Sequence, residues 1–414
     1  MILHLQKNLL AVAIATVMST FTSPALAAQS LTEGESLRIG LTRPELDDLG
    51  RGRVGEAAAD ALETGLWANP TLEYSRDNSR NGTGVREETW QLSQPFDLSG
   101  RRRLRREAGE QRIVAAEADA RQFRVERAVE IRRGFFQLLL HERQLAALDA
   151  WANRFAETER VIGKLRAAGE ASGYDLRRLA RERQAAVAQR AEKHAELERI
   201  REQFAALLGT GISAYAGIMG HLLPDAPAPV ETLLGKIDAR PDLASLGARA
   251  AASDLDGRAA ARGWIPEVTL GIGAKRGDYG FGPNEKVTSF SAAIPLPVFD
   301  RQQPGQQRAA AQAMAARAEY RLARSRAEGQ LRGLHRQVTQ LVAAAGRYRN
   351  EAAAQSGDLV RVADSAYRAG ESTVLELLDA YKGALEAETT ALDLEWKARE
   401  ASIELDQLTG SYPE

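Results

Sequence analysis

Two very long stretches of the chain place apolar residues at the spacing of an amphipathic helix. Residues 101–166 contain no proline, and their apolar positions are separated by combinations of three and four residues. This seam consists of Ile131, Phe135, Leu138, Leu145, Leu148, Ala152, Phe155, Ile162 and Leu165. Residues 301–367 form a counterpart with no proline after Pro304. At about 1.5 Å per residue each helix would be roughly 100 Å long, so each needs partner helices along its whole length.

Four shorter helices are predicted as these partners, over residues 174–208, 231–262, 374–408 and 44–68. The segment 174–208 ends at Gly209, which suits a C-terminal cap. Laid end to end, 174–208 and 231–262 match the first long helix, and 374–408 and 44–68 match the second. The break between stacked pieces falls at mid-height, where we expect a non-helical belt.

Two other regions alternate apolar and polar residues at the spacing of β-strands, over about 71–97 and 267–297. The alternating apolar positions are Leu72, Tyr74, Trp90, Leu92, Val268, Leu270, Ile272, Phe290, Ala292 and Ile294. Such a pattern is typical of membrane strands that are apolar outside and polar inside, although a small sheet with one face in water is the alternative. Two hairpins cannot close a membrane barrel. If the strands face lipid, several chains must pool them, and three chains would supply about 12 strands and 12 helical columns.

The chain contains an internal duplication. Ala168-Gly169-Glu170 recurs as Ala369-Gly370-Glu371, and Leu207-Leu208-Gly209 recurs as Leu408-Thr409-Gly410, each 201 residues later. The junction before the first long helix recurs before the second at nearly the same offset. Each repeat therefore reads as strand, strand, long helix, tight turn and helix. The repeats span about 43–230 and 231–414, with helical hairpins over about 101–208 and 301–409.

The first 27 residues are typical of a secretory signal. Lys7 supplies a positive charge, Leu9 to Val17 form a short apolar region, and Ala25-Leu26-Ala27 is a small-x-small cleavage site. Residues 28–414 are then expected to form one elongated unit. Because no later stretch of about 18 apolar residues occurs, we expect a periplasmic, secreted or β-inserted protein.

Composition argues against several classes of protein. The 55 basic and 56 acidic residues balance, which does not favour a nucleic-acid partner. The chain has no cysteine, so it has no disulfide, thiol nucleophile or thiolate metal site. None of its five histidines is paired with another at metal-ligand spacing. We therefore expect no catalytic, cofactor-binding or metal site, and no enzyme activity.

One charge run is conspicuous, between Arg101 and Arg106 at the start of the first long helix. It could meet lipid phosphates at the inner face of a membrane, but a helix face in water is the favoured interpretation. Arginines at a helix start oppose the helix dipole. Asp97 or Glu107 is expected to compensate.

Several segments together carry a family resemblance. They are Ala68-Asn69-Pro70, the junction from Leu92 to Arg101, Arg240-Pro241-Asp242-Leu243, the junction from Ile294 to Arg301, and the two Ala-Gly-Glu turns. The chain resembles the TolC-like outer-membrane factor (outer membrane efflux protein) family from about Arg43 to Gly410. The Gly100-Arg101 junction is most similar to the CzcC-type heavy-metal efflux branch.

The resemblance implies a mainly α-helical fold with a membrane β-barrel portion. A homotrimer would form a 12-stranded β-barrel in outer-membrane lipid on a 12-helix α-barrel that crosses the periplasm of a Gram-negative bacterium. Its tip would dock on a periplasmic adaptor (membrane fusion) protein linked to an inner-membrane resistance-nodulation-division pump. The implied function is a passive duct for divalent heavy-metal cations. The alternatives are the same duct for drugs or secreted polypeptides, or a periplasmic adaptor, which would need a β-rich region beside a single hairpin.

The resemblance also implies roles for residues at the two tight turns. Gly169, Glu170, Gly370 and Glu371 would form the tip turns that contact the adaptor, and Tyr367 matches a gating tyrosine of the family. Acids just inside the following helices would ring the pore entrance, namely Asp175, Glu376 and Asp379. The alternative is that these acids only satisfy helix N-termini. Ser372 departs from the family, because some relatives have a basic residue there that locks the closed state.

Overall fold

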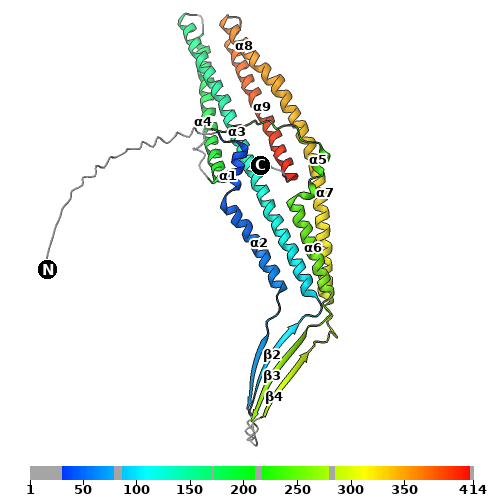
Figure 1. The fold of residues 1–414 in the computed structure, drawn as a ribbon. Helices are drawn as coiled ribbons and strands as arrows, with labels where there is room; N and C mark the ends of the chain where they lie inside the picture. Colours follow the sequence, from blue (N-terminus) through cyan, green and yellow to red (C-terminus); the bar gives the residue numbers. More distant parts are fainter. Residues whose placement is uncertain (1–29, 79–85, 170–171, 210–216, 279–284, 411–414) are drawn as a thin grey trace, which may run out of the picture.

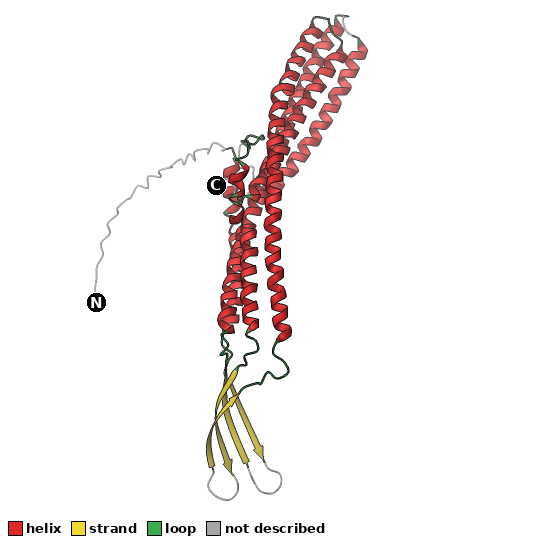
Figure 2. Cartoon of the chain, turned by 90° about the vertical axis from the view of Figure 1, so that its right-hand side faces the viewer, coloured by secondary structure: helices red, strands yellow, loops and turns green. Residues whose placement is uncertain are grey.

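The molecule is elongated, with a small sheet at one end and a layer of long helices continuing from it (Figure 1, Figure 2). This computed structural model describes residues 30–78, 86–169, 172–209, 217–278 and 285–410. The expected signal segment 1–27 and Glu170 lie outside the described residues. Among the described helices, none has an apolar stretch long enough to cross a membrane.

Each half of the chain contributes long antiparallel helices that meet in a turn at the end opposite the sheet. They are α3 (Arg101–Ala167) and α4 (Gly173–Leu208) in the first half, and α7 (Gln303–Tyr348), the π-helical turn η3 (Arg349–Ala353), α8 (Ala354–Arg368) and α9 (Val374–Leu408) in the second. The shorter elements are α1 (Glu33–Leu41), α2 (Pro44–Gly65), α5 (Val230–Leu234), the 3-10 turn η2 (Ile237–Ala239) and α6 (Pro241–Ala261).

The second long helix is helical without a gap from Gln303 to Arg368, but the prediction of one α-helix over 301–367 fails at one point. The π-helical turn Arg349–Ala353 separates α7 from α8. Arg349 in this turn forms ion pairs with Glu388 (2.6 Å) and Glu395 (2.7 Å) of α9. Such turns insert an extra residue into a helix without needing a special residue type. The turn contains neither proline nor glycine, so the sequence gives no local signal for it.

The predicted helix over 231–262 is also wrong, because it is divided into α5, η2 and α6. Arg240 is extended, with φ −62° and ψ 132°, and Pro241 then begins α6. The ring of a proline disfavours the helical conformation of the residue before it, which explains the break.

The short helices stack in the opposite pairing to the one that was predicted. Arg43, just before α2, donates a hydrogen bond from Nη1 to the carbonyl oxygen of Ala206 at the end of α4 (3.1 Å). Gly410, just after α9, lies against Pro241 at the start of α6. Thus α2 continues the column of α4, and α6 continues the column of α9. The two short helices have similar lengths, so length alone could not assign them to their columns.

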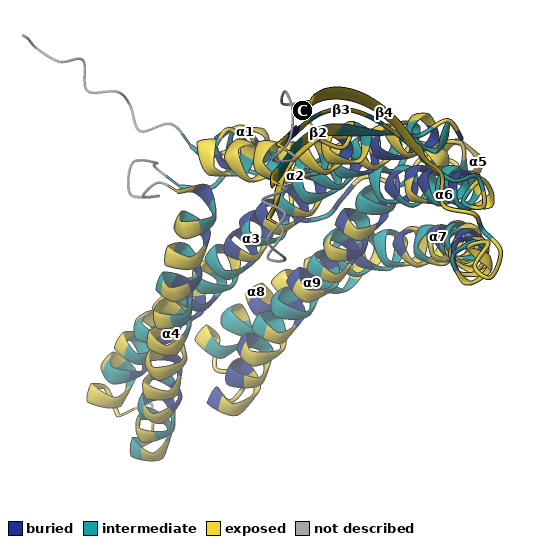
Figure 3. Cartoon of the chain, turned by 90° about the horizontal axis from the view of Figure 1, so that it is seen from below, coloured by how far each residue is buried: buried dark blue, intermediate teal, exposed yellow. Residues whose placement is uncertain are grey.

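The sheet joins the two halves of the chain. Its antiparallel strands are β1 (Thr71–Asn78), β2 (Arg86–Phe96), β3 (Val268–Asp278) and β4 (Glu285–Ala293), in the order β1-β2-β3-β4. The pair β2–β3 connects the hairpin of the first repeat to that of the second. Seen along the long axis, the sheet is curved and continues the curve of the helical layer (Figure 3).

The register of the sheet separates apolar from polar side chains. Cross-strand neighbours share a face, so Leu72, Leu92, Ile272 and Phe290 form one row of an apolar face. The opposite face carries Glu73, Gln91, Gly273 and Ser289 in the equivalent row. The apolar side chains are largely exposed in the single chain, with Phe290 81% exposed. Nothing within the described chain covers this apolar face.

Three apolar clusters hold the helical layer together. The central cluster packs α1, α3, α4 and α9 around Phe135, Phe136 and Phe204. The tip cluster packs the two hairpins around Trp151, Phe155 and Tyr381. The lateral cluster joins α5, α6, α7 and α9. Because α3 contributes to two of the clusters, it links the hairpins to the rest of the layer.

We predict opposite effects for two glycine-to-alanine substitutions within α3. A Cβ at Gly109 would lie 2.7 Å from the Cβ of Ala61 in α2, so Gly109→Ala should destabilise by about 1–3 kcal/mol through overpacking. No atom lies within 4 Å of a Cβ built at Gly163, so Gly163→Ala should stabilise by up to about 1 kcal/mol through helix propensity. Thermal unfolding of both variants is the measurement. Equal shifts in the two variants would contradict the close packing of α2 on α3.

Candidate functional site at the helical tip

The tip consists of two turns that lie at the same end of the molecule (Figure 1). Gly169 (φ 85°) and Gly370 (φ 77°) adopt the left-handed conformation that closes each preceding helix. Glu371 donates its backbone N–H to the carbonyl oxygen of Ala366 (2.8 Å), completing the second turn. An open cleft of about 670 Å³ lies between the two turns, lined by residues from both hairpins. The structure thus brings the two predicted turns together.

Side-chain caps fix the start of each returning helix. Ser172 accepts hydrogen bonds from the backbone N–H groups of Tyr174 (3.1 Å) and Asp175 (3.3 Å) at the start of α4. Thr373 and Glu376 form a reciprocal capping box at the start of α9. These contacts satisfy N–H groups that a helix start leaves unpaired.

The three predicted acids have different surroundings. The carboxylate of Glu376 accepts hydrogen bonds from the backbone N–H (2.8 Å) and the hydroxyl (3.1 Å) of Thr373, and these bonds lower its pKa. Asp379 is exposed one turn further along α9. Asp175 is half-buried on α4, on the other hairpin. Glu376 therefore has the local capping role that was the alternative to an acidic ring at the pore entrance. Because Glu376 is also exposed, the acidic ring stays a prediction.

Tyr367 lies between the two hairpins. Burial raises the pKa of its phenol, and the nearby charge of Asp175 raises it further. Both side chains line the cleft between the turns. The structure thus brings Tyr367 of α8 close to Asp175 of α4. Ser372 lines the same cleft, and its buried hydroxyl has no hydrogen-bond partner among the described residues.

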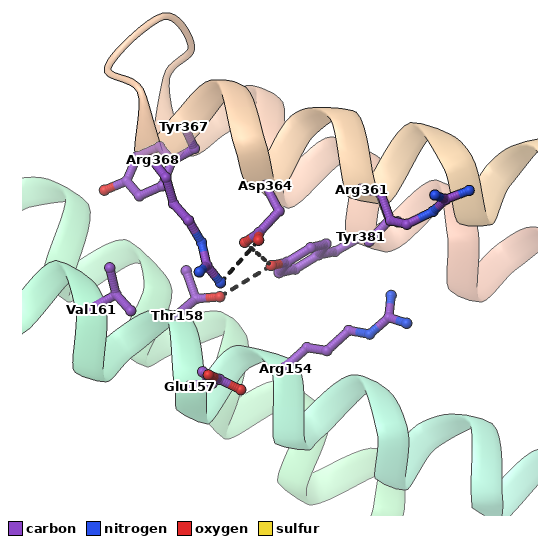
Figure 4. A pocket seen from close by; sticks show the side chains of 10 residues that line it. Arg154, Glu157, Thr158, Val161, Arg361, Asp364, Tyr367, Arg368 and Tyr381 are labelled. Atoms are coloured by element: carbon purple, nitrogen blue, oxygen red, sulfur yellow. Dashed lines mark hydrogen bonds and ion pairs between the residues drawn. The ribbon is translucent and has the colours of Figure 1, made fainter.

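A polar network deeper in the tip joins α3, α8 and α9 (Figure 4). The Tyr381 hydroxyl shares a hydrogen bond with the Thr158 hydroxyl (3.2 Å) and donates to the Asp364 carboxylate (3.4 Å). Arg368 forms an ion pair with Asp364 (3.0 Å). These groups line a cavity of about 210 Å³ with Arg154 and Arg361. Burial is the main cause of the raised pKa of Tyr381.

Sequence reasoning missed this network. The only signal was the spacing of Asp364 and Arg368, which puts both on one face of a helix. Tyr381 falls on the apolar seam of α9 and packs on Phe155, with ring centroids 5.9 Å apart. Nothing in the local pattern indicates that its hydroxyl would meet Thr158, because that contact joins the two repeats.

A second link between the hairpins is ionic. Lys382 of α9 pairs with Glu182 of α4 (2.8 Å), and Arg181 also binds this carboxylate (2.7 Å). The hydrogen bond from Lys382 is the largest cause of the lowered pKa of Glu182. The four tip helices are therefore held by an aromatic cluster, a hydroxyl–carboxylate network and an ion pair. Within the described residues, no group of three or more His, Cys, Asp or Glu could hold a metal ion.

The arginine run at the opposite end of α3 is mostly engaged locally. Asp97 accepts hydrogen bonds from the backbone N–H groups of Ser99 (2.9 Å) and Arg102 (3.2 Å), so it caps the start of α3. Its burial opposes ionisation, but the hydrogen bonds from Ser99 and Arg102 together outweigh that effect and lower its pKa. Arg101 pairs with Glu267 (3.1 Å). The expectation that Asp97 compensates the helix dipole is confirmed.

Comparison with known proteins identifies the family. The model of the outer membrane efflux protein family matches residues 237–411. The cobalt-zinc-cadmium resistance protein CzcC of Cupriavidus metallidurans is 27% identical over 391 residues, which cover 93% of this chain and 89% of CzcC. The nickel-cobalt-cadmium resistance protein NccC of Alcaligenes xylosoxydans xylosoxydans is 30% identical over 303 residues, covering 69% of this chain and 65% of NccC.

The chain belongs to the outer membrane efflux protein family. Solved structures of similar fold include CusC, with a TM-score of 0.77, 18% identity and 92% coverage of each chain. They also include VceC of Vibrio cholerae, with a TM-score of 0.75, 19% identity and coverage of 91% of this chain and 96% of VceC. The resemblance to outer-membrane factors of the CzcC type is thus confirmed. Its family assigns this efflux protein to the outer membrane.

We predict that charge and capping at Glu376 can be separated by substitution. Glu376→Gln should keep the hydrogen bonds to Thr373, whereas Glu376→Ala should remove them and let the start of α9 fray. Amide hydrogen exchange over residues 371–378 should be faster in Glu376→Ala than in Glu376→Gln. Because the folded pKa is lowered, the wild-type contribution is present above the unfolded pKa and is lost as pH falls through the folded pKa. Equal exchange in both variants would show that the capping box contributes nothing.

Proposed function

We propose that this efflux protein is a homotrimeric passive duct that carries divalent heavy-metal cations across the periplasm and outer membrane. In this proposal it receives its cargo from a periplasmic adaptor and an inner-membrane resistance-nodulation-division pump. The single observation that carries the duct is the sheet. Its apolar face is uncovered, and the outer edges of β1 and β4 are unpaired within the part of the chain that the structure describes. This sheet continues directly into the curved helical layer.

Unpaired strand edges and an uncovered apolar face call for further copies of the chain and for lipid. In a membrane every backbone polar group must be paired, so a sheet there must close on itself. A four-stranded sheet is too narrow to close, and three copies would supply about 12 strands. Pairing of β4 with β1 of the next copy would also bring α7 beside α2 of that copy. Both helices have exposed apolar side chains available for such packing, including Leu62 of α2 and Leu322 of α7.

The proposed cargo rests on the relatives. CzcC, NccC and the nickel and cobalt resistance protein CnrC of Cupriavidus metallidurans are all described as metal resistance proteins. Drugs or secreted polypeptides are the competing cargo for the same duct. The family assignment and the double hairpin argue against a periplasmic adaptor. As a passive conduit the protein would need no catalytic or cofactor site.

The tip is the proposed gate and adaptor contact. The turn residues Gly169, Glu170, Gly370 and Glu371 would meet the adaptor, and Tyr367 would belong to the closed latch. Under threefold symmetry Asp175, Glu376 and Asp379 would place carboxylates around the aperture, where a ring of negative charge attracts cations. The Thr158–Tyr381–Asp364 network would hold the two hairpins together in the closed state, beside the cleft that Tyr367 and Asp175 both line.

We predict that an arginine on the apolar face of the sheet prevents assembly of the trimer. Leu270→Arg should cost about 2–4 kcal/mol if the side chain faces the middle of the bilayer. The matched control is Ser289→Arg, which adds the same side chain to the polar face of the neighbouring strand. The oligomeric mass of the detergent-purified protein identifies the trimer, and the amount of protein at that mass gives the trimer yield. Tolerance to cobalt, zinc and cadmium is scored in cells that carry the cognate adaptor and pump.

The two readouts separate the parts of the proposal. A full yield of Leu270→Arg trimer would refute lipid contact by these strands. A wild-type trimer that restores tolerance to drugs but not to metals would refute the cargo and leave the duct intact.

We predict that the tip acids control cation passage. Removing Glu376 and Asp379 together by alanine should change single-channel conductance in planar bilayers and weaken block by divalent cations, because both carboxylates are exposed on one face of α9. The control removes the same charge near the sheet, through Glu110→Ala with Glu117→Ala on α3. Unchanged conductance and block in the tip variant would eliminate the acidic ring.

A further inference from the structure

The apolar face of the sheet does not end where its strands end. Along β4 the residues on this face are Thr288, Phe290 and Ala292, and the same alternation continues past the last paired residue through Ile294, Leu296 and Val298. We name residues 294–299, between β4 and α7, the elbow. Its apolar side chains are exposed, with Leu296 77% and Phe299 96% exposed. Figure 1 shows this link along the edge of the molecule.

A row of charges limits the apolar face at the far end of the strands. Arg76, Glu88, Arg276 and Lys286 are cross-strand neighbours and share the apolar face. From Lys286 to Ala293 the strand covers about 23 Å along its own axis, or about 18 Å along the membrane normal at a tilt of about 40°. The apolar band of an outer-membrane barrel is about 25 Å tall. The paired part of β4 therefore falls about 7 Å short, and the elbow lies where the missing part must be.

The backbone of the elbow suits an apolar environment. Pro295 and Pro297 have no N–H group, so two of its six residues expose no donor. The N–H of Val298 donates to the carbonyl oxygen of Leu296 (2.8 Å). Fewer unpaired donors mean a lower cost of leaving water. The elbow is followed by Asp300, whose carboxylate accepts hydrogen bonds from the backbone (2.7 Å) and side chain (3.1 Å) of Gln302.

Aromatic rings and arginines lie on or beside the links that join the sheet to the helices. Trp264 precedes β3, and Trp67 precedes β1, and both are about half exposed. The guanidinium of Arg102 lies 3.6 Å from the centre of the Trp67 ring. Within the described residues, Arg102 and Arg301 form no ion pair with a carboxylate, so their charges remain available to lipid phosphates. Aromatic side chains beside basic groups are typical of the boundary between lipid chains and headgroups.

We propose that the elbow is a membrane-contacting surface that lies in the periplasmic leaflet, with Ile294 and Leu296 among the lipid chains and Phe299 at the headgroups. The partner is phospholipid, and the nearby guanidinium groups meet its phosphates. This inference rests on the proposed function, because it requires the strands above the elbow to face lipid. It adds a surface outside the paired strands to the membrane contact of the protein.

The test uses single cysteines, because the chain has no native cysteine. Leu296→Cys and Phe299→Cys carry a polarity-sensitive fluorophore in the full-length protein, reconstituted into phosphatidylcholine–phosphatidylglycerol vesicles. The vesicles contain lipids with a nitroxide near the headgroup or deep in the chain. Leu270→Cys, in the middle of β3, reports whether the strands face lipid. Met314→Cys, exposed on α7, is the water-facing control.

The expected result is that labels at 296 and 299 are quenched more by the shallow nitroxide, the label at 270 more by the deep one, and the label at 314 by neither. Water-like, unquenched labels at 296 and 299 with a quenched label at 270 would overturn the elbow and leave the duct intact. Labels at 296 and 299 shielded from both iodide and lipid nitroxide would overturn it in favour of packing against a second copy. An unquenched label at 270 would overturn the proposed lipid contact of the strands, and the elbow with it.

Discussion

The whole molecule depends on lateral packing of α3. A helix of 67 residues has no core of its own, and helices gain most of their stability in proteins by burying one face. α3 buries apolar residues in both the central and the tip clusters, against α1, α4 and α9. It also packs on α2 and α6 below them. Because its neighbours come from both repeats, packing on α3 couples the helical hairpin of one repeat to that of the other. The duplication therefore produces one cooperative layer in place of two separate domains.

The ends of this layer are specified by different forces. At the tip, aromatic packing carries the stability, because the ion pairs there are partly exposed and such pairs contribute little individually. The contact of Tyr381 with Thr158 and Asp364 adds direction to that packing, since a buried hydroxyl must find a partner. At the sheet end, the backbone ladder fixes the register and the side-chain alternation fixes which face is apolar. The tip and the sheet lie at opposite ends of the layer, so the proposed opening of the tip would leave the backbone ladder of the sheet in place.

The sequence predicted the elements that carry strong periodic signals. α3 and α9 begin and end within one or two residues of their expected limits, because the seam of each is long and each is bounded by glycine or a capping residue. The alternation of β2 and β3 was equally clear. The π-helical turn at Arg349 could not be predicted from the local sequence. Its ion pairs are with Glu388 and Glu395, about 40 residues away in sequence. The stacking of α2 on α4 could not be predicted either, because it is marked by a tertiary hydrogen bond of Arg43. At the site, Gly169 and Gly370 predicted the two turns. For Glu376 the sequence offered two roles, a helix cap and a member of the acidic ring, and did not decide between them.

The two repeats diverge where the sheet meets the helices, and this divergence has a physical explanation. The first junction is compact: Asp97 caps α3, Ser99 is buried, and Gly100 takes a left-handed conformation. The second junction replaces this turn with prolines and exposed apolar residues, and Gln302 takes the left-handed conformation there despite its side chain. A non-glycine residue in that conformation carries strain, and its bonds to Asp300 help to hold it. This strained conformation is reasonable if the chain must extend outward from the sheet before α7 can begin. The first repeat has no such need, because its junction is next to β3 and is covered by the second half of the same chain. The second junction borders the open edge of β4, so its conformation reflects surroundings outside the chain.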